Sequence, residues 1–527
     1  MLLPILPIVI PMFAAAAAML AWRSVAWQRG VAVAGMGGLL ASALALLFTV
    51  DREGFVLVQV GSWPAPFGIT LVADRFSAIM VTLAAVMGFL VCLFSLHEAN
   101  RRDVHRGFFA LLLVLLSGVS GAFLTGDLFN LYVWFEVLLI SSFVLLSLGG
   151  GRLQLEGAMK YVALNLVGSM LFLTGTGVLY GVAHTLNMAD LHGAMQEVQR
   201  QNPTLALALA AVFATAFSLK AAVFPLFFWL PASYHVPSSG VCAVFAAMLT
   251  KVGVYALVRT FTVVFPEAAA GPVMTAVLIA AAVTMVSGVL GAVTQYEMKR
   301  ILAWHSVSQV GYIVAGVGLL ASPNEDVRTL GLAATIVFLV HHGTIKPALF
   351  LVAGLINRRE GTTELKPIGG LAGAAPWLAA LFLLSALSLA GLPPSSGFWA
   401  KFAVLKALVV AQEWWVLAAA LAAGLLTLMS MMKIWNEAFW KNRPEKAEDY
   451  AASEARPIPK SFAAPLVVLV ILVTLIGLWP QPLLGYADRA AEQLLDPDAY
   501  VEAVGVPRDT FTTGATMEAP LAKEGVE

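Results

Sequence analysis

Long apolar runs, separated by short polar segments, make up most of the sequence. Each run is about 20 residues or longer, which is enough for a helix to cross a hydrocarbon core about 30 Å thick. A soluble protein of this size would instead form several domains whose elements alternate apolar and polar faces. The pattern therefore predicts an all-α polytopic membrane protein with about 14 transmembrane helices. The predicted spans are residues 2–21, 31–50, 75–96, 107–125, 127–149, 158–182, 204–230, 240–264, 271–294, 299–321, 329–356, 374–411, 414–436 and 463–482.

Two of these spans contain helix-breaking residues. The seventh span contains Pro225, and the twelfth contains GLPPSSGFW, with Pro393 and Pro394. Proline removes a backbone hydrogen bond and kinks or breaks a helix. We therefore predict that both spans are broken near their middle. Interrupted spans at corresponding places, five spans apart, indicate two inverted halves with hydrated centres.

The charged residues give the orientation. Residues of this kind are 12% of the chain, against 60% hydrophobic ones. With the N-terminus outside, more of the 31 lysines and arginines fall on the inner side than on the outer, which predicts both termini outside. The first span is followed by Arg23 and Arg29 and preceded by no basic residue, so a retained anchor is predicted rather than a signal peptide. Residues 484–527 are polar, and we predict an outward-facing, partly disordered tail.

Four lysines lie well inside apolar runs. A lysine at the centre of a bilayer costs about 2.5 kcal/mol or more unless it faces a wet or paired interior. One such residue could be held by a carbonyl group, but four in one chain indicate a function. Lys406 and Lys433 lie near span ends, where the side chain can reach the interface. The four internal lysines are Lys220, Lys251, Lys346 and Lys401.

Acidic and histidine side chains accompany these lysines. Glu136 lies in the middle of the fifth span and is predicted to share a site with Lys220. A lysine with a movable counter-ion can store and release a proton. His342 and Lys346 are four residues apart, hence on one helical face, and histidine titrates near neutrality. The alternative for His342, and for His341, is a buried histidine that only binds a hydroxyl group.

The motifs of several other function classes are missing. The two cysteines, Cys92 and Cys242, lie in or beside apolar spans. The sequence has no Cys-x-x-Cys pair, no histidines spaced for haem, no dinucleotide-binding glycine loop and no Walker motif. We expect no cofactor, no metal site, no catalytic residue and no nucleic-acid partner, so energy is expected from an ion gradient or a partner protein.

Several motifs resemble one family. They are FSLKAAVFPLFFWLP (217–231), GVCAVFAAMLTKVGVYALVR (240–259), YEMKRILAWHSVSQVGYI (296–313) and HHGTIKPALFLVAGLI (341–356). In this order they are similar to the antiporter-like subunits of respiratory complex I and of Mrp-type multisubunit cation/proton antiporters, from about residue 70 to 440. Within this family, the sequence is most similar to the D-type Mrp subunits. This choice rests on HTLNMADL (184–191), on Lys251 and on a lysine rather than a glutamate at position 401.

The resemblance implies a fold and a set of site residues. Helices 1–3 would occupy residues 1–106, two inverted repeats would occupy 107–264 (helices 4–8) and 271–436 (helices 9–13), helix 14 would be 463–482, and the tail 484–527. By motif position a proton relay would comprise Glu136, Lys220, Lys251, His342, Lys346 and Lys401, with His341, His305 and Gln309 as possible accessory residues. Gln309 stands where some relatives have histidine.

We therefore predict a proton-translocating subunit of a multisubunit antiporter that exchanges Na⁺, or K⁺ or Li⁺, for H⁺ across the cytoplasmic membrane. Its implied partners are a larger antiporter-like subunit and several small membrane subunits, and it would be a transporter rather than an enzyme. One alternative is a proton-pumping membrane subunit of NADH:quinone oxidoreductase or of a membrane hydrogenase, which use the same scaffold. A purely structural scaffold is a second alternative, but it leaves four buried lysines unexplained.

Overall fold

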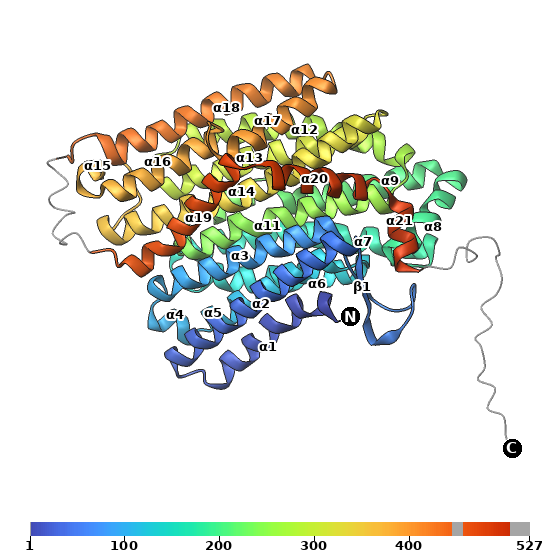
Figure 1. Ribbon diagram of the computed structural model, residues 1–527, viewed down its shortest axis with the longest axis horizontal. Coiled ribbons are helices and arrows are strands. Elements are labelled where there is room, and N and C mark those ends of the chain that lie inside the picture. Colours follow the sequence, from blue (N-terminus) through green and yellow to red (C-terminus); the bar gives the residue numbers. More distant parts are fainter. Residues whose placement is uncertain (1, 445–456, 506–527) are drawn as a thin grey trace.

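Helices that run side by side dominate the computed structural model, which describes residues 2–444 and 457–505 (Figure 1). The long helices are α1 (Leu6–Leu20), α2 (Val25–Glu53), α3 (Arg75–Glu98), α5 (Phe108–Leu124), α6 (Leu128–Ser147), α7 (Arg152–Ala183), α9 (Pro203–Ala221), α11 (Ser239–Arg259), α12 (Glu267–Val293), α13 (Met298–Gly318), α14 (Glu325–Glu360), α16 (Pro376–Ala390), α17 (Ser396–Val410), α18 (Trp414–Ile434) and α19 (Lys460–Leu478). Shorter elements are α4 (Arg101–His105), β1 (Val56–Gln59), β2 (Thr70–Ala73), α8 (Met188–Gln201), α10 (Trp229–Ser233), α15 (Leu371–Ala374), α20 (Gln481–Leu494) and α21 (Pro497–Val504).

The all-α polytopic membrane fold is confirmed. Each predicted span coincides with one of these helices or with a broken pair. Among the described residues, 11 helices are long and apolar enough to cross a membrane, and α5 and α16 are shorter apolar helices. The count of about 14 spans therefore stays a prediction.

Two helices form the centre of the molecule. The apolar windows of α11 and α14 are buried along their whole length, whereas those of α1 and α18 are only one-third buried. A helix that is apolar all round is buried on every side. α11 and α14 pack against each other, and α14 also contacts α13 and α17. Side chains on α11 and α14 therefore face protein rather than lipid.

Two interruptions lie beside this centre. α9 ends at Ala221, and Ala222 adopts a left-handed conformation with φ of 63°. α16 ends at Ala390, and Gly391 caps it with φ of 91°. Nearby side chains satisfy backbone groups of the first break: the Thr284 hydroxyl accepts a hydrogen bond from the Phe224 amide at 2.8 Å. Irregular backbone is tolerated at membrane depth only where protein or a water-filled cavity satisfies it.

Matching contacts relate the two halves of the bundle. A Cβ at Gly121 would touch the ring of Trp134, and a Cβ at Gly291 would touch the ring of Trp304. Gly121 and Trp134 lie on α5 and α6, while Gly291 and Trp304 lie on α12 and α13. The same close helix pair therefore occurs twice at equal sequence spacing. These contacts support two related repeats, and the repeat boundaries 107–264 and 271–436 stay predictions.

The region after α19 differs from its prediction. Residues 481–494 and 497–504 form helices α20 and α21, so this part of the expected tail is ordered structure, and residues 506–527 lie outside the described residues. The buried residues of α20 recur at helical spacing and rest on α14 and α3. The prediction used the polar composition of residues 484–527 as a whole and so missed this amphipathic pattern. The β1–β2 hairpin and α8 were likewise not predicted, and Figure 1 shows the hairpin beside α2.

Candidate functional site

All four internal lysines lie inside the protein. Their exposed fractions are 6% for Lys220, 0% for Lys251, 0% for Lys346 and 7% for Lys401. None of them is in an ion pair of the described residues. Burying an ammonium group without a carboxylate is costly, so these positions were not filled for stability. The lysines are therefore candidates for groups that gain and lose a proton.

Lys220 lies in the last turn of α9, directly before the first break. Its Nζ donates to the Ser169 hydroxyl of α7 at 2.9 Å and lies 5.5 Å from the centre of the Phe135 ring. Glu136 is close enough for its charge to act on Lys220, but the two form no ion pair within 4.0 Å. One Glu136 oxygen is buried without a protein hydrogen-bond partner among the described residues. Glu136 and Lys220 therefore interact through their charges across a gap and not through a direct ion pair.

A second group joins α11 to α14. Lys251 donates to the carbonyl of Ala246 one turn below it, and Lys346 donates to the Leu302 carbonyl of α13 at 2.6 Å. The charges of both lysines act on His342. Neither ring nitrogen of His342 has a protein partner among the described residues. His342 is therefore near both lysines, and its ring nitrogens are available to bind water.

The third group surrounds the second break. Lys401 on α17 donates to the Ala390 carbonyl at 2.9 Å and lies 5.1 Å from the centre of the Tyr312 ring. A cavity of about 430 Å³ borders its side chain. His341 shares a hydrogen bond of 2.9 Å with the Ser396 hydroxyl, and His305 one of 3.0 Å with Ser430. The charge of Lys401 acts on both histidines.

Several buried polar atoms near the lysines have no protein hydrogen-bond partner. Buried polar groups are nearly always paired with protein or ordered water, since leaving them unpaired costs free energy. A group of such atoms therefore points to internal water. Among the described residues these atoms include Thr250 Oγ1, His305 Nδ1, both polar side-chain atoms of Gln309, His341 Nε2, both ring nitrogens of His342, and Ser388 Oγ.

One gap remains in the series. No charge interaction or hydrogen bond of the described residues joins Lys220 directly to Lys251, although α9 and α11 touch at this level. A Cβ at Gly253 would lie 2.5 Å from the Ala221 nitrogen and 2.8 Å from the Lys220 carbonyl carbon. Gly253 therefore allows the two lysine-bearing backbones to approach closely, and any transfer between them would need water.

A comparison with known protein families identifies the family of this chain. The family described as NADH:quinone oxidoreductase/Mrp antiporter, TM, matches residues 125–427. The chain belongs to this family. The matched region of this antiporter-family chain contains both helix breaks and all four buried lysines.

Relatives of known name match nearly the whole chain. It is 42% identical over 504 residues to the D-type Na(+)/H(+) antiporter subunit of Alkalihalophilus pseudofirmus, covering 95% of this chain and 99% of the relative. It is 36% identical over 501 residues to the protein of the same name in Bacillus subtilis, covering 95% and 98%. The resemblance to D-type Mrp subunits is thereby confirmed.

Solved structures give the same fold. A chain in the structure of the Mrp complex from Dietzia sp. DQ12-45-1b is 32% identical, with a TM-score of 0.86 over 95% of this chain and 99% of that one. A chain of respiratory complex I from Thermus thermophilus is 25% identical, with a TM-score of 0.78 over 93% and 99%. The expected relationship to both complexes is therefore confirmed, while the residue roles stay predictions.

Sequence reasoning missed one buried charged pair in this antiporter-family chain. Arg259 is buried against Asp74, and each side chain is at most 3% exposed. Burial raises the pKa of Asp74, but the charge of Arg259 and hydrogen bonds from Arg259 and Ser77 lower it more, so the net pKa lies below its ordinary value. The only sequence signal was the position of Arg259, eight residues and hence about two turns after Lys251 on the same helical face.

Proposed function

We propose that this chain is the proton-translocating subunit of a multisubunit antiporter that exchanges Na⁺, or K⁺ or Li⁺, for H⁺ across the cell membrane. The observation that carries the proposal is the burial of four lysines beside two broken helices in a chain that is 42% identical to a D-type Na(+)/H(+) antiporter subunit. Buried ionisable residues in membrane proteins mark ion and proton pathways.

The proposed relay runs from Glu136 and Lys220 through Lys251 to His342 and Lys346, and ends at Lys401. Lys251 acts electrostatically on His342 and on Lys346, so a proton gained at one group makes protonation of the next less favourable. Such groups titrate together rather than one by one. A proton that arrives at one end of the relay therefore promotes release at the other.

Hydrogen-bond partners set the lysine positions in this scheme. Ser169 holds Lys220, and the Ala390 carbonyl, freed at the end of α16, holds Lys401. Both partners are neutral, so neither fixes the lysine in its charged form as a carboxylate would. The charge of each lysine can therefore respond to its neighbours. His341, His305 and Gln309 are proposed as accessory residues that hold water along the same line.

The test is a Lys220→Ala variant of the whole complex. In vesicles from an antiporter-deficient strain, we expect cation-dependent proton movement to fall by about 10²-fold or more, as for loss of a proton-transferring group. Lys160→Ala is the matched control, because Lys160 is half-exposed and its ion pair within residues 2–444 and 457–505 is with Glu156 on the surface. Normal exchange by an assembled Lys220→Ala complex would remove this lysine from the mechanism.

A second candidate comes from the fold comparison. A chain of the membrane-bound sulfane sulfur reductase matches with a TM-score of 0.86 at 25% identity, so the same scaffold also occurs in a respiratory complex. In such a role, protons would be driven by redox chemistry in other subunits. Proton movement that requires NADH, and is indifferent to Na⁺, K⁺ and Li⁺, would favour this candidate over the antiporter.

The surroundings of the chain follow from the proposal. We propose that its partners are a larger antiporter-like subunit and several small membrane subunits, that it has no catalytic residue of its own, and that both termini lie outside the cell membrane. Labelling of single cysteines introduced at exposed Gln201 and at Arg101 from the two sides of intact cells would test the orientation.

A further inference from the structure

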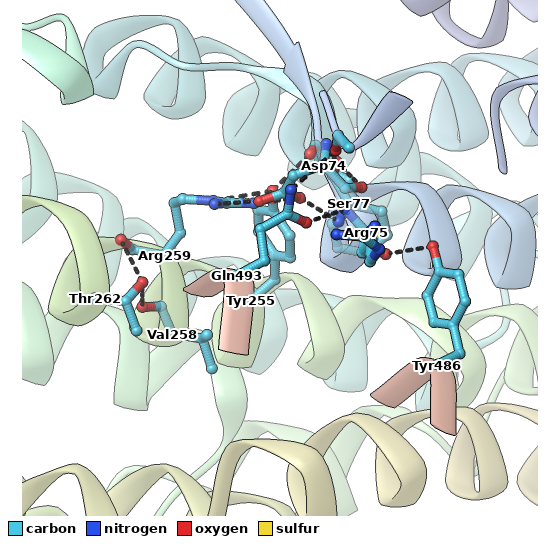
Figure 2. Close-up of polar contacts among 11 residues, drawn as sticks. Asp74, Arg75, Ser77, Tyr255, Val258, Arg259, Thr262, Tyr486 and Gln493 are labelled. Carbon is cyan, nitrogen blue, oxygen red and sulfur yellow. Dashed lines mark hydrogen bonds and ion pairs between the residues drawn. The ribbon is translucent and has the colours of Figure 1, made fainter. Parts of the chain in front are cut away.

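The outer end of α11 carries a buried ion pair that the relay does not use. Arg259 donates to Asp74 through both terminal nitrogens, with Nη1–Oδ2 at 2.7 Å and Nη2–Oδ1 at 2.8 Å. Figure 2 shows the two side chains meeting between α11 and the start of α3. Paired contacts of this kind fix a guanidinium group in one orientation.

Aromatic side chains enclose the guanidinium group. The Arg259 Cζ atom lies 5.3 Å from the centre of the Tyr255 ring and 5.4 Å from that of Tyr500. The Tyr255 hydroxyl accepts a hydrogen bond from Arg259 Nη2 at 3.0 Å and donates to the Phe123 carbonyl at 2.6 Å. Its ring stacks on Phe76 at 4.8 Å. Four helices, α3, α5, α11 and α21, thus converge on one charged group.

The C-terminal helices fasten this cluster from outside. The Tyr486 hydroxyl donates to the Arg75 carbonyl at 3.0 Å, and the Gln493 side chain accepts from the Arg75 amide at 3.0 Å (Figure 2). Gln493 also donates to the Gly54 carbonyl at 2.9 Å. Residues 481–504, which we call the C-terminal strap, therefore hold the first turn of α3 and bring Tyr500 onto Arg259.

The buried ion pair lies on the same helix face as a lysine of the proposed relay. Lys251, Tyr255 and Arg259 are four residues apart and hence on one face of α11, and Arg259 is about 12 Å beyond Lys251 along the helix. An arginine stays charged under all conditions in proteins, and a fixed arginine in a pore repels protons and cations. A buried ion pair is weak evidence for stability alone, so its position invites a functional explanation.

We propose that the Asp74–Arg259 pair, covered by Tyr500 of the C-terminal strap, is the outer seal of the proton path, which stops protons and cations from leaking between Lys251 and the outer surface. This inference rests on the proposed relay. The pair does not transfer protons itself. Asp74 positions Arg259 across the path, and the tyrosines exclude water around it.

The alternative is a clamp that only stabilises the packing of α3 on α11. The two readings differ in what the loss of the pair does to an assembled complex. A clamp variant lowers the amount or thermal stability of the complex and leaves the remaining complexes tight. A seal variant leaves complexes that dissipate an imposed proton gradient when no exchangeable cation is present.

The experiment measures the passive decay of an imposed proton gradient in vesicles that contain the whole complex, without Na⁺, K⁺ or Li⁺. Asp74→Asn and Arg259→Gln are expected to accelerate the decay several-fold per assembled complex, and the reversed pair Asp74→Arg with Arg259→Asp is expected to restore much of the tightness. Glu156→Gln is the matched control, because Glu156 is half-exposed and pairs with Lys160 on the surface of α7, away from the strap.

Two further variants keep the outcome clear. If the charge variants do not assemble, Tyr500→Leu removes the covering ring without touching either charge and is still expected to accelerate the decay. If the proton gradient decays as slowly with Tyr500→Leu, or with assembled Asp74→Asn, as with the wild-type complex, the proposal of a seal is wrong. In the same vesicles, Lys220→Ala should lose exchange while the imposed proton gradient decays as slowly as in wild type. Normal exchange by Lys220→Ala would count against the relay. Slow, wild-type decay in Asp74→Asn and Arg259→Gln would count against the seal.

Discussion

The two halves of the bundle share a close helix contact but differ in their charges. The contact of Gly121 with Trp134 recurs as that of Gly291 with Trp304, and two residues after each tryptophan the first half has Glu136 where the second has Ser306. α13 and α17 contain no acidic residue, and α14 has acids only in its first and last turns. The second half instead contains His305, His341 and His342, all fully buried.

Within the proposed relay, this difference would correspond to two kinds of proton site. In the first half a carboxylate and a lysine can offset each other's charge, so the pair can stay charged inside the protein. In the second half lysines and histidines face one another with neutral partners, so adding a second positive charge is opposed by the first. We therefore propose that the first half holds charge and that the second half passes it on.

Among the changes that test this difference, removing the acid of the first half should reduce exchange the most. Glu136→Gln takes away the charge that, among the described residues, favours a charged Lys220, so we expect cation-dependent exchange to fall by about 10²-fold. The measurement is proton movement in vesicles at equal complex content. Glu156→Gln is the matched control, since Glu156 lies on the surface of α7. Full exchange by Glu136→Gln would mean that the acid is not what separates the two halves.

Adding an acid to the second half should have a smaller effect. Ser306→Asp puts a carboxylate at the position that corresponds to Glu136. This position is next to His305, and the Ser306 hydroxyl and Lys346 both donate to the Leu302 carbonyl. The new charge would hold a neighbouring lysine or histidine protonated and slow its release, so we expect a several-fold fall in exchange. Ser306→Asn has nearly the same shape without the charge and should fall less. Equal loss in both variants would assign the effect to packing.

The close approach of the lysine-bearing helices gives a third prediction. In Gly253→Ala the added Cβ meets backbone of Lys220 and Ala221 rather than a flexible side chain, so α9 and α11 must move apart. Overpacking of this kind costs about 1–3 kcal/mol, and we expect lower thermal stability together with reduced exchange. Gly177→Ala, with open space around the new Cβ, is the control. Unchanged exchange would mean that the spacing of these helices does not matter for transfer.

The sequence predicted the framework because its signal is local. Apolar runs of sufficient length gave each spanning helix, and Pro225 and Pro394 marked both interruptions, since each effect lies within one segment. The short hairpin, α8 and the C-terminal strap escaped prediction. They are brief elements whose apolar residues make sense only against the helices that they cover.

The lysines of the candidate site could also be found from sequence, but their partners could not. A charge within an apolar run is visible locally, whereas Ser169 and Ser396 are ordinary serines until the fold brings them to Lys220 and His341. Arg259 and Asp74 are 185 residues apart and each stands near the end of a span, where charged residues are normally exposed. Only the tertiary structure pairs them.

A serine partner offers a fourth, more modest prediction. Ser396→Ala removes the hydroxyl that bonds His341 Nδ1, and a hydrogen bond of this type contributes about 1 kcal/mol. We expect exchange to change by less than about tenfold, with the cation preference kept. Ser396→Thr, which keeps a hydroxyl, should stay closer to wild type. Complete loss of exchange in Ser396→Ala would make this hydroxyl part of the relay rather than a support for His341.

The smallest expected effect concerns the outer seal: the passive proton leak should not change with pH near neutrality. The pKa of Asp74 is depressed by Arg259, so the stabilisation from the pair is fully present above the ordinary carboxyl value and is lost only as the pH falls through the lowered value. The phenol groups of Tyr255 and Tyr500, whose rings lie beside Arg259, stay neutral near pH 7. Passive proton decay in wild-type vesicles, corrected for the imposed gradient, should therefore be flat between about pH 5 and 9. A leak that rises steeply within this range would mean that a titrating group, rather than a permanently charged pair, closes the outer end of the first half.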